Sequence, residues 1–127
     1  MILNNKVAFV TGGSRGIGKA ISISLAKAGA KVVLTYQKQK DSAEKVASII
    51  KDFGGSALVQ QLDVCNRETV KNAMNECVNH YNKIDILVNC AGINKPTDFD
   101  KVEDKDWDEI LDVNLKGVFI CSQESLS

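Results

Sequence analysis

The residues of this chain best suited to ligand binding form a glycine-rich stretch near the amino terminus. This stretch, the glycine turn, consists of Thr11, Gly12, Gly13, Ser14, Arg15, Gly16, Ile17 and Gly18. Spaced glycines let a ligand approach the backbone closely, and backbone N–H groups at the start of a helix bind anions. The chemistry predicted here is therefore the binding of a diphosphate. The alternative is a tight connection between two elements that binds no ligand.

The segments on either side of the glycine turn favour the ligand-binding interpretation. Residues 6–11 form a short, mainly apolar and β-branched run, typical of a strand buried on both faces of a parallel sheet. From Ile17 onward, apolar residues recur at helical spacing until Gly29 provides a stop. A strand, a glycine turn and a helix in this order leave free N–H groups and the positive end of a helix dipole facing a ligand.

The alternation of apolar strand and amphipathic helix continues along the chain. Further strands are predicted at residues 31–36, 57–62 and 84–88, and further helices at residues 41–53, 66–80 and 103–126. Asp41 and Glu44 have the spacing of a capping box, and Asn66 is expected to cap the helix that follows it. This order predicts an α/β fold, a doubly wound parallel sheet with helices on both faces. Residues 92–100 are expected to form a loop at a strand's carboxyl end.

Length and composition indicate one domain over residues 1–127 and exclude several partner classes. The chain has 127 residues, 44% of them hydrophobic, and a formal net charge of zero. It lacks the basic excess of nucleic-acid-binding proteins, and its apolar runs are too short for a bilayer span or a signal peptide. The four cysteines form no C-x-x-C pair, so no metal site is expected. A cytoplasmic protein without nucleic-acid or membrane partners is predicted.

Polar residues gather where the predicted strands end. These ends fall at Thr11-Gly12, Tyr36-Gln37, Asp63-Val64 and Asn89-Cys90. Ligands of doubly wound sheets bind at the carboxyl ends of the strands, so these positions predict a dinucleotide groove. No acid follows the second strand, whereas Lys38 and Arg15 offer cations to a 2′-phosphate. NADP is therefore favoured over NAD, with solvated surface charges as the alternative for both cations.

Two motifs in this chain resemble those of the short-chain dehydrogenase/reductase family. One is the T-G-x-x-x-G-x-G of the glycine turn, and the other is Asn89-Cys90-Ala91-Gly92, which is similar to N-N-A-G with cysteine in place of the second asparagine. The resemblance covers essentially the whole chain and implies a Rossmann-like, NAD(P)-binding fold. It implies that the cofactor is bound by Gly12, Ser14, Arg15, Gly16, Ile17, Gly18, Lys38, Asp63, Val64, Asn89, Ala91 and Gly92.

Asp63 and Asn114 each have a structural alternative beside the role that the resemblance implies. Asp63 would contact the adenine amino group, or it would only cap the helix that starts near Asn66. Asn114 lies on one helical seam with Trp107, Leu111 and Val118, which predicts a buried amide with a hydrogen-bond partner. The resemblance implies instead that Asn114 is the catalytic asparagine that holds a water in a proton relay.

The resemblance implies hydride transfer between a nicotinamide and a carbonyl or secondary alcohol. Residues 85–123 are most similar to bacterial 3-oxoacyl-[acyl-carrier-protein] reductases. The catalytic serine, tyrosine and lysine of the family lie beyond its asparagine, and this chain ends at Ser127 before them. We therefore interpret the chain as the cofactor-binding portion of an enzyme that is homo-oligomeric at full length. The alternative is a non-catalytic dinucleotide-binding remnant or interaction module.

The family's sheet order, 3-2-1-4-5-6-7, would leave the strand at residues 84–88 as an apolar edge in this chain, and such edges promote association. We predict that the isolated 127-residue chain is poorly soluble or self-assembles, and that it reduces no carbonyl substrate. Light scattering after size exclusion and an NADPH-oxidation assay measure the two properties. A monomeric, soluble and active chain would contradict the prediction.

Overall fold

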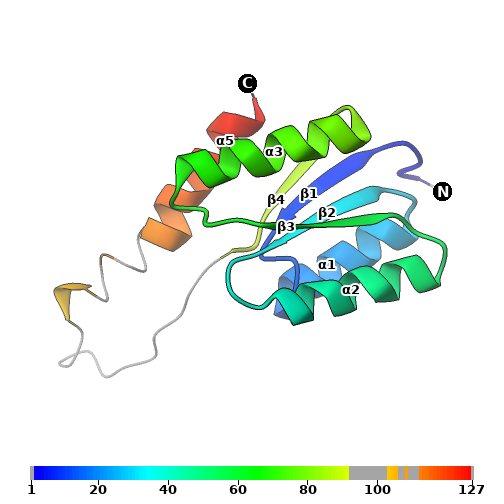
Figure 1. Cartoon of the computed structure of the whole chain (residues 1–127), viewed down its shortest axis with the longest axis horizontal. Helices are drawn as coiled ribbons and strands as arrows, with labels where there is room; N and C mark the ends of the chain where they lie inside the picture. Colours follow the sequence, from blue (N-terminus) through cyan, green and yellow to red (C-terminus); the bar gives the residue numbers. More distant parts are fainter. Residues whose placement is uncertain (1, 92–102, 106–107, 109–111, 127) are drawn as a thin grey trace.

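The computed structural model describes residues 2–91, 103–105, 108 and 112–126. Its described strands form one parallel, four-stranded sheet in the order β3-β2-β1-β4 (Figure 1). The strands are β1 (Val7–Thr11), β2 (Lys31–Tyr36), β3 (Ala57–Gln61) and β4 (Ile86–Asn89). The predicted α/β, doubly wound fold is confirmed. The chain leaves β1 toward β2 on one side and returns to β4 on the other, so the strand order reverses beside the end of β1.

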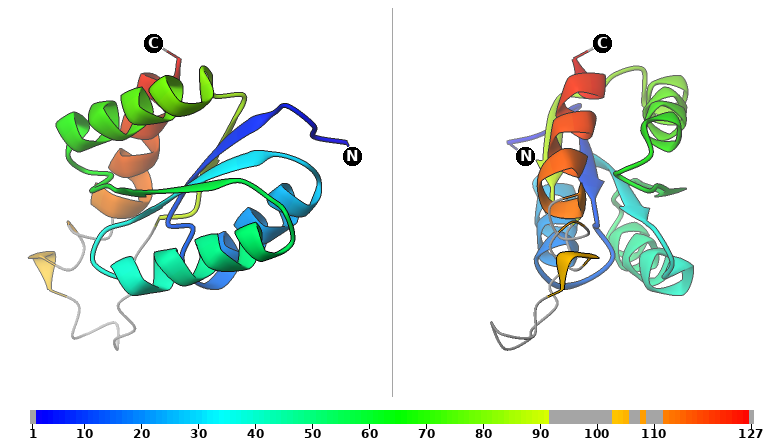
Figure 2. Two further views of the ribbon diagram at one scale, coloured as in Figure 1. Left: turned by 45° about the vertical axis from the view of Figure 1, so that its right-hand side comes forward. Right: turned by 90° about the vertical axis from the view of Figure 1, so that its left-hand side faces the viewer.

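The helices cover both faces of the sheet. They are α1 (Gly16–Lys27), α2 (Lys40–Asp52), α3 (Arg67–Tyr81), the π-helical turn η2 (Asp112–Lys116) and α5 (Gly117–Ser125). Helices α1 and α2 lie on one face, and α3 and α5 lie on the other (Figures 1 and 2). In the described part of the chain, no helix combines the length and the apolar character needed to cross a bilayer.

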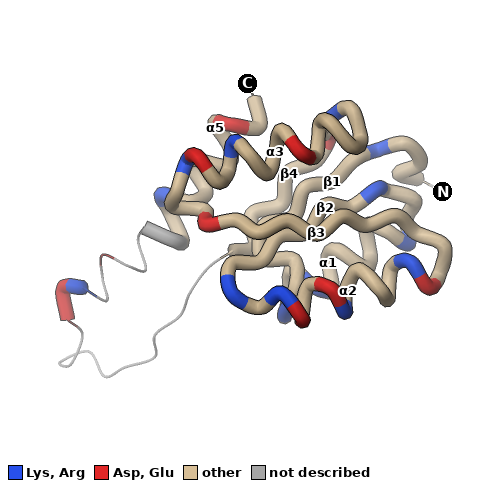
Figure 3. Tube along the Cα trace, viewed as in Figure 1, with Lys and Arg blue, Asp and Glu red and all other residues tan. Residues whose placement is uncertain are grey.

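Strand β1 is buried on both faces because alternate side chains enter two separate cores. Val7 and Phe9 pack with α3 and α5, whereas Ala8 and Val10 pack with α1 and α2. This two-sided burial explains the continuous apolar run in the sequence. Among the described strands, Lys31 is the one charged residue, and the other charges lie on helices and connections (Figure 3).

The two caps predicted from the sequence had different outcomes. The Asn66 side chain accepts hydrogen bonds from the backbone N–H groups of Glu68 and Thr69, at 3.1 and 3.4 Å, so its capping role is confirmed. The prediction of a capping box at Asp41 is wrong. Helix α2 starts one residue earlier, at Lys40, and no described side chain forms a capping hydrogen bond at its start. Asp41 therefore lies inside the first turn, where its carboxylate interacts favourably with the helix dipole instead.

The carboxyl-terminal segment differs from the single helix predicted over residues 103–126. Its described part contains η2 before α5, and two residues of the predicted seam, Trp107 and Leu111, lie outside the described residues. A π-helical turn holds one more residue than an α-helical turn, so a 3.6-residue period does not continue across it. Asn114 is accordingly exposed, and the prediction of a buried amide is wrong.

Arg67, the first residue of α3, links that helix to α5. Its guanidinium lies 3.0 Å from the carboxylate of Glu124 and 5.8 Å from the ring centroid of Phe119. Both partners belong to α5, and the Glu124 side chain is only 11% exposed. A charge pair and a cation–π contact therefore hold the start of α3 against α5.

Asp85 fixes the start of β1 against the segment that leads into β4. Its carboxylate accepts a hydrogen bond from the backbone N–H of Val7 at 2.8 Å and pairs with Lys83 at 3.0 Å. Both contacts lower the pKa of Asp85 below its ordinary value of 3.8. The hydrogen bond from the Val7 N–H has the larger effect, and the contact with Lys83 has the next largest. The charged carboxylate is therefore the form that the folded chain stabilises.

We expect Asp85→Asn to flatten the acid limb of the stability curve. In the wild type, the unfolded carboxyl binds protons at a higher pH than the folded one, so stability falls as pH drops below the ordinary pKa of 3.8. Urea midpoints measured from pH 7 down to acid reveal the slope, with the exposed Asp52→Asn as control. Equal acid slopes in the wild type and Asp85→Asn would contradict the assignment.

Candidate functional site

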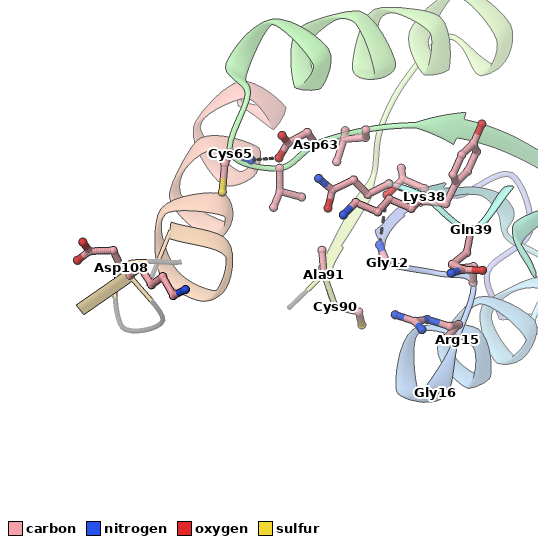
Figure 4. Close-up of a pocket in the computed structure, with 17 residues that line it drawn as sticks. Gly12, Arg15, Gly16, Lys38, Gln39, Asp63, Cys65, Cys90, Ala91 and Asp108 are labelled. Carbon is pink, nitrogen blue, oxygen red and sulfur yellow. Dashed lines mark hydrogen bonds between the residues drawn. The ribbon is translucent and has the colours of Figure 1, made fainter. Parts of the chain in front are cut away.

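A cavity of about 1010 Å³ opens where the carboxyl ends of the strands meet the glycine turn (Figure 4). Eight of the predicted site residues line it: Gly12, Ser14, Arg15, Gly16, Lys38, Asp63, Val64 and Ala91. They come from the glycine turn, the segment after β2, the segment after β3 and the end of β4. The topology therefore brings residues that are far apart in the sequence to one edge of the sheet, as the strand-end pattern predicts.

Other predicted residues lie elsewhere. Ile17 is 77% exposed, Asn89 is exposed at the end of β4, and neither lines the cavity. Gly18, the last residue of the glycine turn, is buried and does not line the cavity, and Asn114 also lies outside the cavity wall. Gly92 is outside the described residues. The cavity is thus built from a subset of the positions that the family motifs name.

Sequence reasoning missed several residues that line the cavity. These are Thr35, Gln39, Leu62, Cys65, Lys105 and Asp108. Thr35 belongs to β2, where a β-branched residue is expected for its strand propensity alone. Its position at the end of a strand, next to Tyr36-Gln37, was the signal that would have identified it.

Close backbone contacts set the shape of the glycine turn. A Cβ added to Gly18 would stand directly against the carbonyl oxygen of Gly12, and one added to Gly12 would lie 2.8 Å from Cα of Ala91. These approaches place the start of α1 against the ends of β1 and β4. Glycine is required at both positions because no side chain fits there.

The first turn of α1 is open to the cavity. Gly16 has a φ of +53°, and a Cβ built on it would meet nothing within 4 Å. Arg15, the residue before the helix, is extended, and among the described residues no side chain caps α1 and no acid lies in its first turn. The free N–H groups and the helix dipole therefore form an anion-binding position beside the cavity.

The Thr11 hydroxyl holds the end of β4 against the end of β1. Thr11 Oγ1 accepts hydrogen bonds from the N–H groups of Cys90 and Ala91, both at 3.2 Å, and it donates to the carbonyl of Val88 at 3.4 Å. Thr11 is only 1% exposed. A buried side chain thus fixes the wall of the cavity that Cys90 and Ala91 form.

Asp63 closes the turn between β3 and α3, with its carboxylate at the cavity (Figure 4). Its Oδ1 accepts a hydrogen bond from the N–H of Cys65 at 3.0 Å, and its backbone N–H donates to the hydroxyl of Thr69 at 3.1 Å. Since Asn66 caps α3, the alternative that Asp63 only caps this helix is wrong. Because Asp63 also lines the cavity, its carboxylate could accept a hydrogen bond from the amino group of a ligand.

The cavity is lined by cations and by a weakly acidic thiol. Arg15 and Lys38 are exposed and reach it from the glycine turn and from the segment after β2 (Figure 4). Cys90 is partly buried, and burial raises the pKa of its thiol. The neutral thiol is therefore the dominant form at pH 7, and Cys90 is not an activated nucleophile.

Alanine substitutions compare Gly18, where no side chain fits, with Gly16, where there is open space for one. On helix propensity alone, Gly18→Ala would stabilise by about 1 kcal/mol, but the added methyl would meet the Gly12 carbonyl. We expect a net loss of about 3 kcal/mol. Gly16→Ala meets open space and is expected to cost about 1 kcal/mol through its positive φ. Urea denaturation measures both. A Gly18→Ala protein as stable as the wild type would contradict this geometry.

Comparison with known proteins gives the chain its family. The sequence profile described as short chain dehydrogenase matches residues 6–127. A 3-oxoacyl-[acyl-carrier-protein] reductase FabG from Staphylococcus epidermidis is 42% identical over 120 residues, which are 94% of this chain and 49% of that protein. The corresponding reductase from Synechocystis is 40% identical over 121 residues, covering 95% of this chain and 49% of its own length.

Solved structures agree with the sequence relatives. A short chain dehydrogenase from Burkholderia cenocepacia, in complex with NADP, is 39% identical with a TM-score of 0.93, covering 99% of this chain and 51% of its own. A short-chain dehydrogenase/reductase from Serratia marcescens is 41% identical with a TM-score of 0.93 and the same coverage. The chain spans about half the length of the curated relatives that it matches. With the strand order, the glycine turn and the cavity in place, these matches establish that the chain belongs to the short-chain dehydrogenase family.

Proposed function

We propose that this chain binds NADP in the cavity, as part of an oxidoreductase that acts on a carbonyl or a secondary alcohol. The observation that carries the proposal is the open first turn of α1 at Gly16, which faces a cavity of about 1010 Å³ at the point where the strand order reverses. Support also comes from the NADP complex of the Burkholderia cenocepacia relative. The bound cofactor would, in its reduced form, supply a hydride to a carbonyl, or, in its oxidised form, accept one from a secondary alcohol.

The adenosine half of the cofactor would lie at the carboxyl ends of β2 and β3. In this proposal, the N–H groups of the first turn of α1 bind the diphosphate, and Arg15 and Lys38 pair with the 2′-phosphate. The Asp63 carboxylate accepts from the adenine amino group, and the backbone of Val64 contacts the ring. The segment after β2 contains cations and no acid, so the ribose phosphate is preferred to a free hydroxyl pair.

The other half of the cofactor would pass the end of β4. Asn89, Ala91 and Gly92 are proposed to contact this ribose, with Ala91 held in place by the Thr11 hydroxyl. Asn114 is proposed to hold a water for proton transfer near the nicotinamide. It lies in η2 and is exposed, so a water can reach its amide from solvent.

The names of the relatives support a finer proposal for the substrate. We propose a 3-oxoacyl group on an acyl carrier protein as the substrate, because the curated relatives from Staphylococcus epidermidis and Synechocystis are named for that reduction. A homo-oligomer in the cytoplasm is proposed from membership of the family. The second candidate is dinucleotide binding without catalysis, for which the cavity and the open first turn of α1 are sufficient. A serine and a Tyr-x-x-x-Lys motif encoded downstream of these residues would contradict it.

Titration with NADPH and NADH tests the cofactor proposal. Arg15→Ala and Lys38→Ala should each weaken NADPH binding by about tenfold or more, because each removes a charge-assisted contact with the 2′-phosphate. NADH binding should change less than about twofold, since NADH lacks that phosphate. Fluorescence titration or calorimetry measures the affinities.

The matched control is Lys19→Ala, which removes an exposed cation on α1 that does not line the cavity. It should leave both affinities unchanged. Equal losses for NADPH and NADH would contradict the role of the two cations. A folded wild-type chain without measurable NADPH affinity would remove the proposed function.

A further inference from the structure

Thr35 holds two consecutive residues of the glycine turn at once. Its hydroxyl oxygen accepts a hydrogen bond from the N–H of Gly12 at 3.2 Å, and its carbonyl accepts one from the N–H of Gly13 at 3.2 Å. Thr35 is only 1% exposed and lies one residue before the end of β2. The turn that leaves β1 is therefore fastened to the neighbouring strand through one side chain and one backbone group.

These bonds decide which N–H groups remain for a ligand. Gly12 and Gly13 donate to Thr35, so their N–H groups are already paired with β2 and are not available to a ligand. The first turn of α1 follows directly, and Gly16 faces open space. Thr35 therefore sets the direction from which the anion-binding N–H groups meet a ligand, although the hydroxyl itself bonds to the backbone.

The same residue leads into the segment that carries Lys38. Leu62 donates its N–H to the carbonyl of Tyr36 at 2.9 Å, and the Gln61 side chain donates to the carbonyl of Gln37 at 3.3 Å. The backbone beyond Thr35 is thus held to β3 while Thr35 holds the glycine turn. Thr35 therefore connects the glycine turn, proposed to bind the diphosphate, with the segment of Lys38, proposed to bind the 2′-phosphate.

We propose that Thr35 is a positioning residue for cofactor binding, which aligns the diphosphate-binding N–H groups of α1 by fixing Gly12 through its hydroxyl. This inference rests on the proposed NADP binding, and it assigns a role to a residue outside the glycine turn. Removal of the hydroxyl would leave the N–H of Gly12 without its acceptor and release the turn from β2. The loss should be felt by ligands that contain a diphosphate.

The test compares NADPH with adenosine 2′-monophosphate, which has the 2′-phosphate and the adenine but no diphosphate. Thr35→Val keeps the shape of the side chain and removes the hydroxyl. We expect it to weaken NADPH binding about tenfold and to change adenosine 2′-monophosphate binding less than about twofold. Thr35→Ser restores the hydroxyl and should bind NADPH within about twofold of the wild type.

Tyr81→Phe is the matched control. It removes a hydroxyl that lies 2.7 Å from Oγ of Ser56, at the opposite edge of the sheet from the cavity. It should leave both affinities unchanged. Equal weakening of the two ligands in Thr35→Val would indicate a general loss of structure and overturn the proposal, as would unchanged NADPH binding or failure of Thr35→Ser to restore it.

Amide hydrogen exchange of the wild type tests the same point without a variant, and so covers the case in which Thr35→Val fails to fold. The Gly12 amide should be protected before NADPH is added, whereas the amides of Gly16 and Ile17 should gain protection only with NADPH. A Gly12 amide that is protected only with NADPH would overturn the positioning role. Absence of NADPH binding by the wild type would instead remove the proposed function, and the inference with it.

Discussion

The full pairing and burial of β1 is the constraint on which the rest of this structure depends. It is hydrogen-bonded to β2 and β4 along its two edges, and its side chains enter both cores. Its carboxyl end lies beside those of β2 and β4, so three strand ends and the start of α1 converge. The glycine turn follows from that convergence, because Gly18 and Gly12 must approach closely for the helix to start there.

Two buried hydroxyls convert this crowded edge into a defined binding surface. Thr11 holds the end of β4, and Thr35 holds the glycine turn. Both threonines are 1% exposed and bond mainly to backbone groups. The backbone around the cavity is therefore arranged before a ligand arrives, and less conformational entropy is lost on binding than in a mobile loop. Family membership and the geometry of the cavity both support the proposed binding of NADP.

The sequence predicted the parts of this molecule that depend on local patterns. Apolar runs marked the strands, and Asn66 marked the start of α3. Prediction failed at the exact start of a helix, at a change of helix type and at a contact between distant residues. Asp41 has the right spacing for a cap, but α2 starts one residue earlier. Asn114 fits an apolar seam, yet η2 interrupts the period that defined it. Thr35 reads as an ordinary strand residue, because its bond to Gly12 spans 23 positions.

The contact of Arg67 with α5 gives the cavity a mechanical link to a distant surface. Arg67 follows the capping residue Asn66 directly, and the turn that Asp63 closes lies just before it. Glu124 and Phe119, both on α5, contact the guanidinium of Arg67. A displacement of α5 by anything that packs on it would pull on the first residue of α3 and strain the adjoining turn. Because Asp63 in that turn is proposed to bind the adenine, such a displacement would be expected to change how tightly the cavity holds the adenosine half of the cofactor.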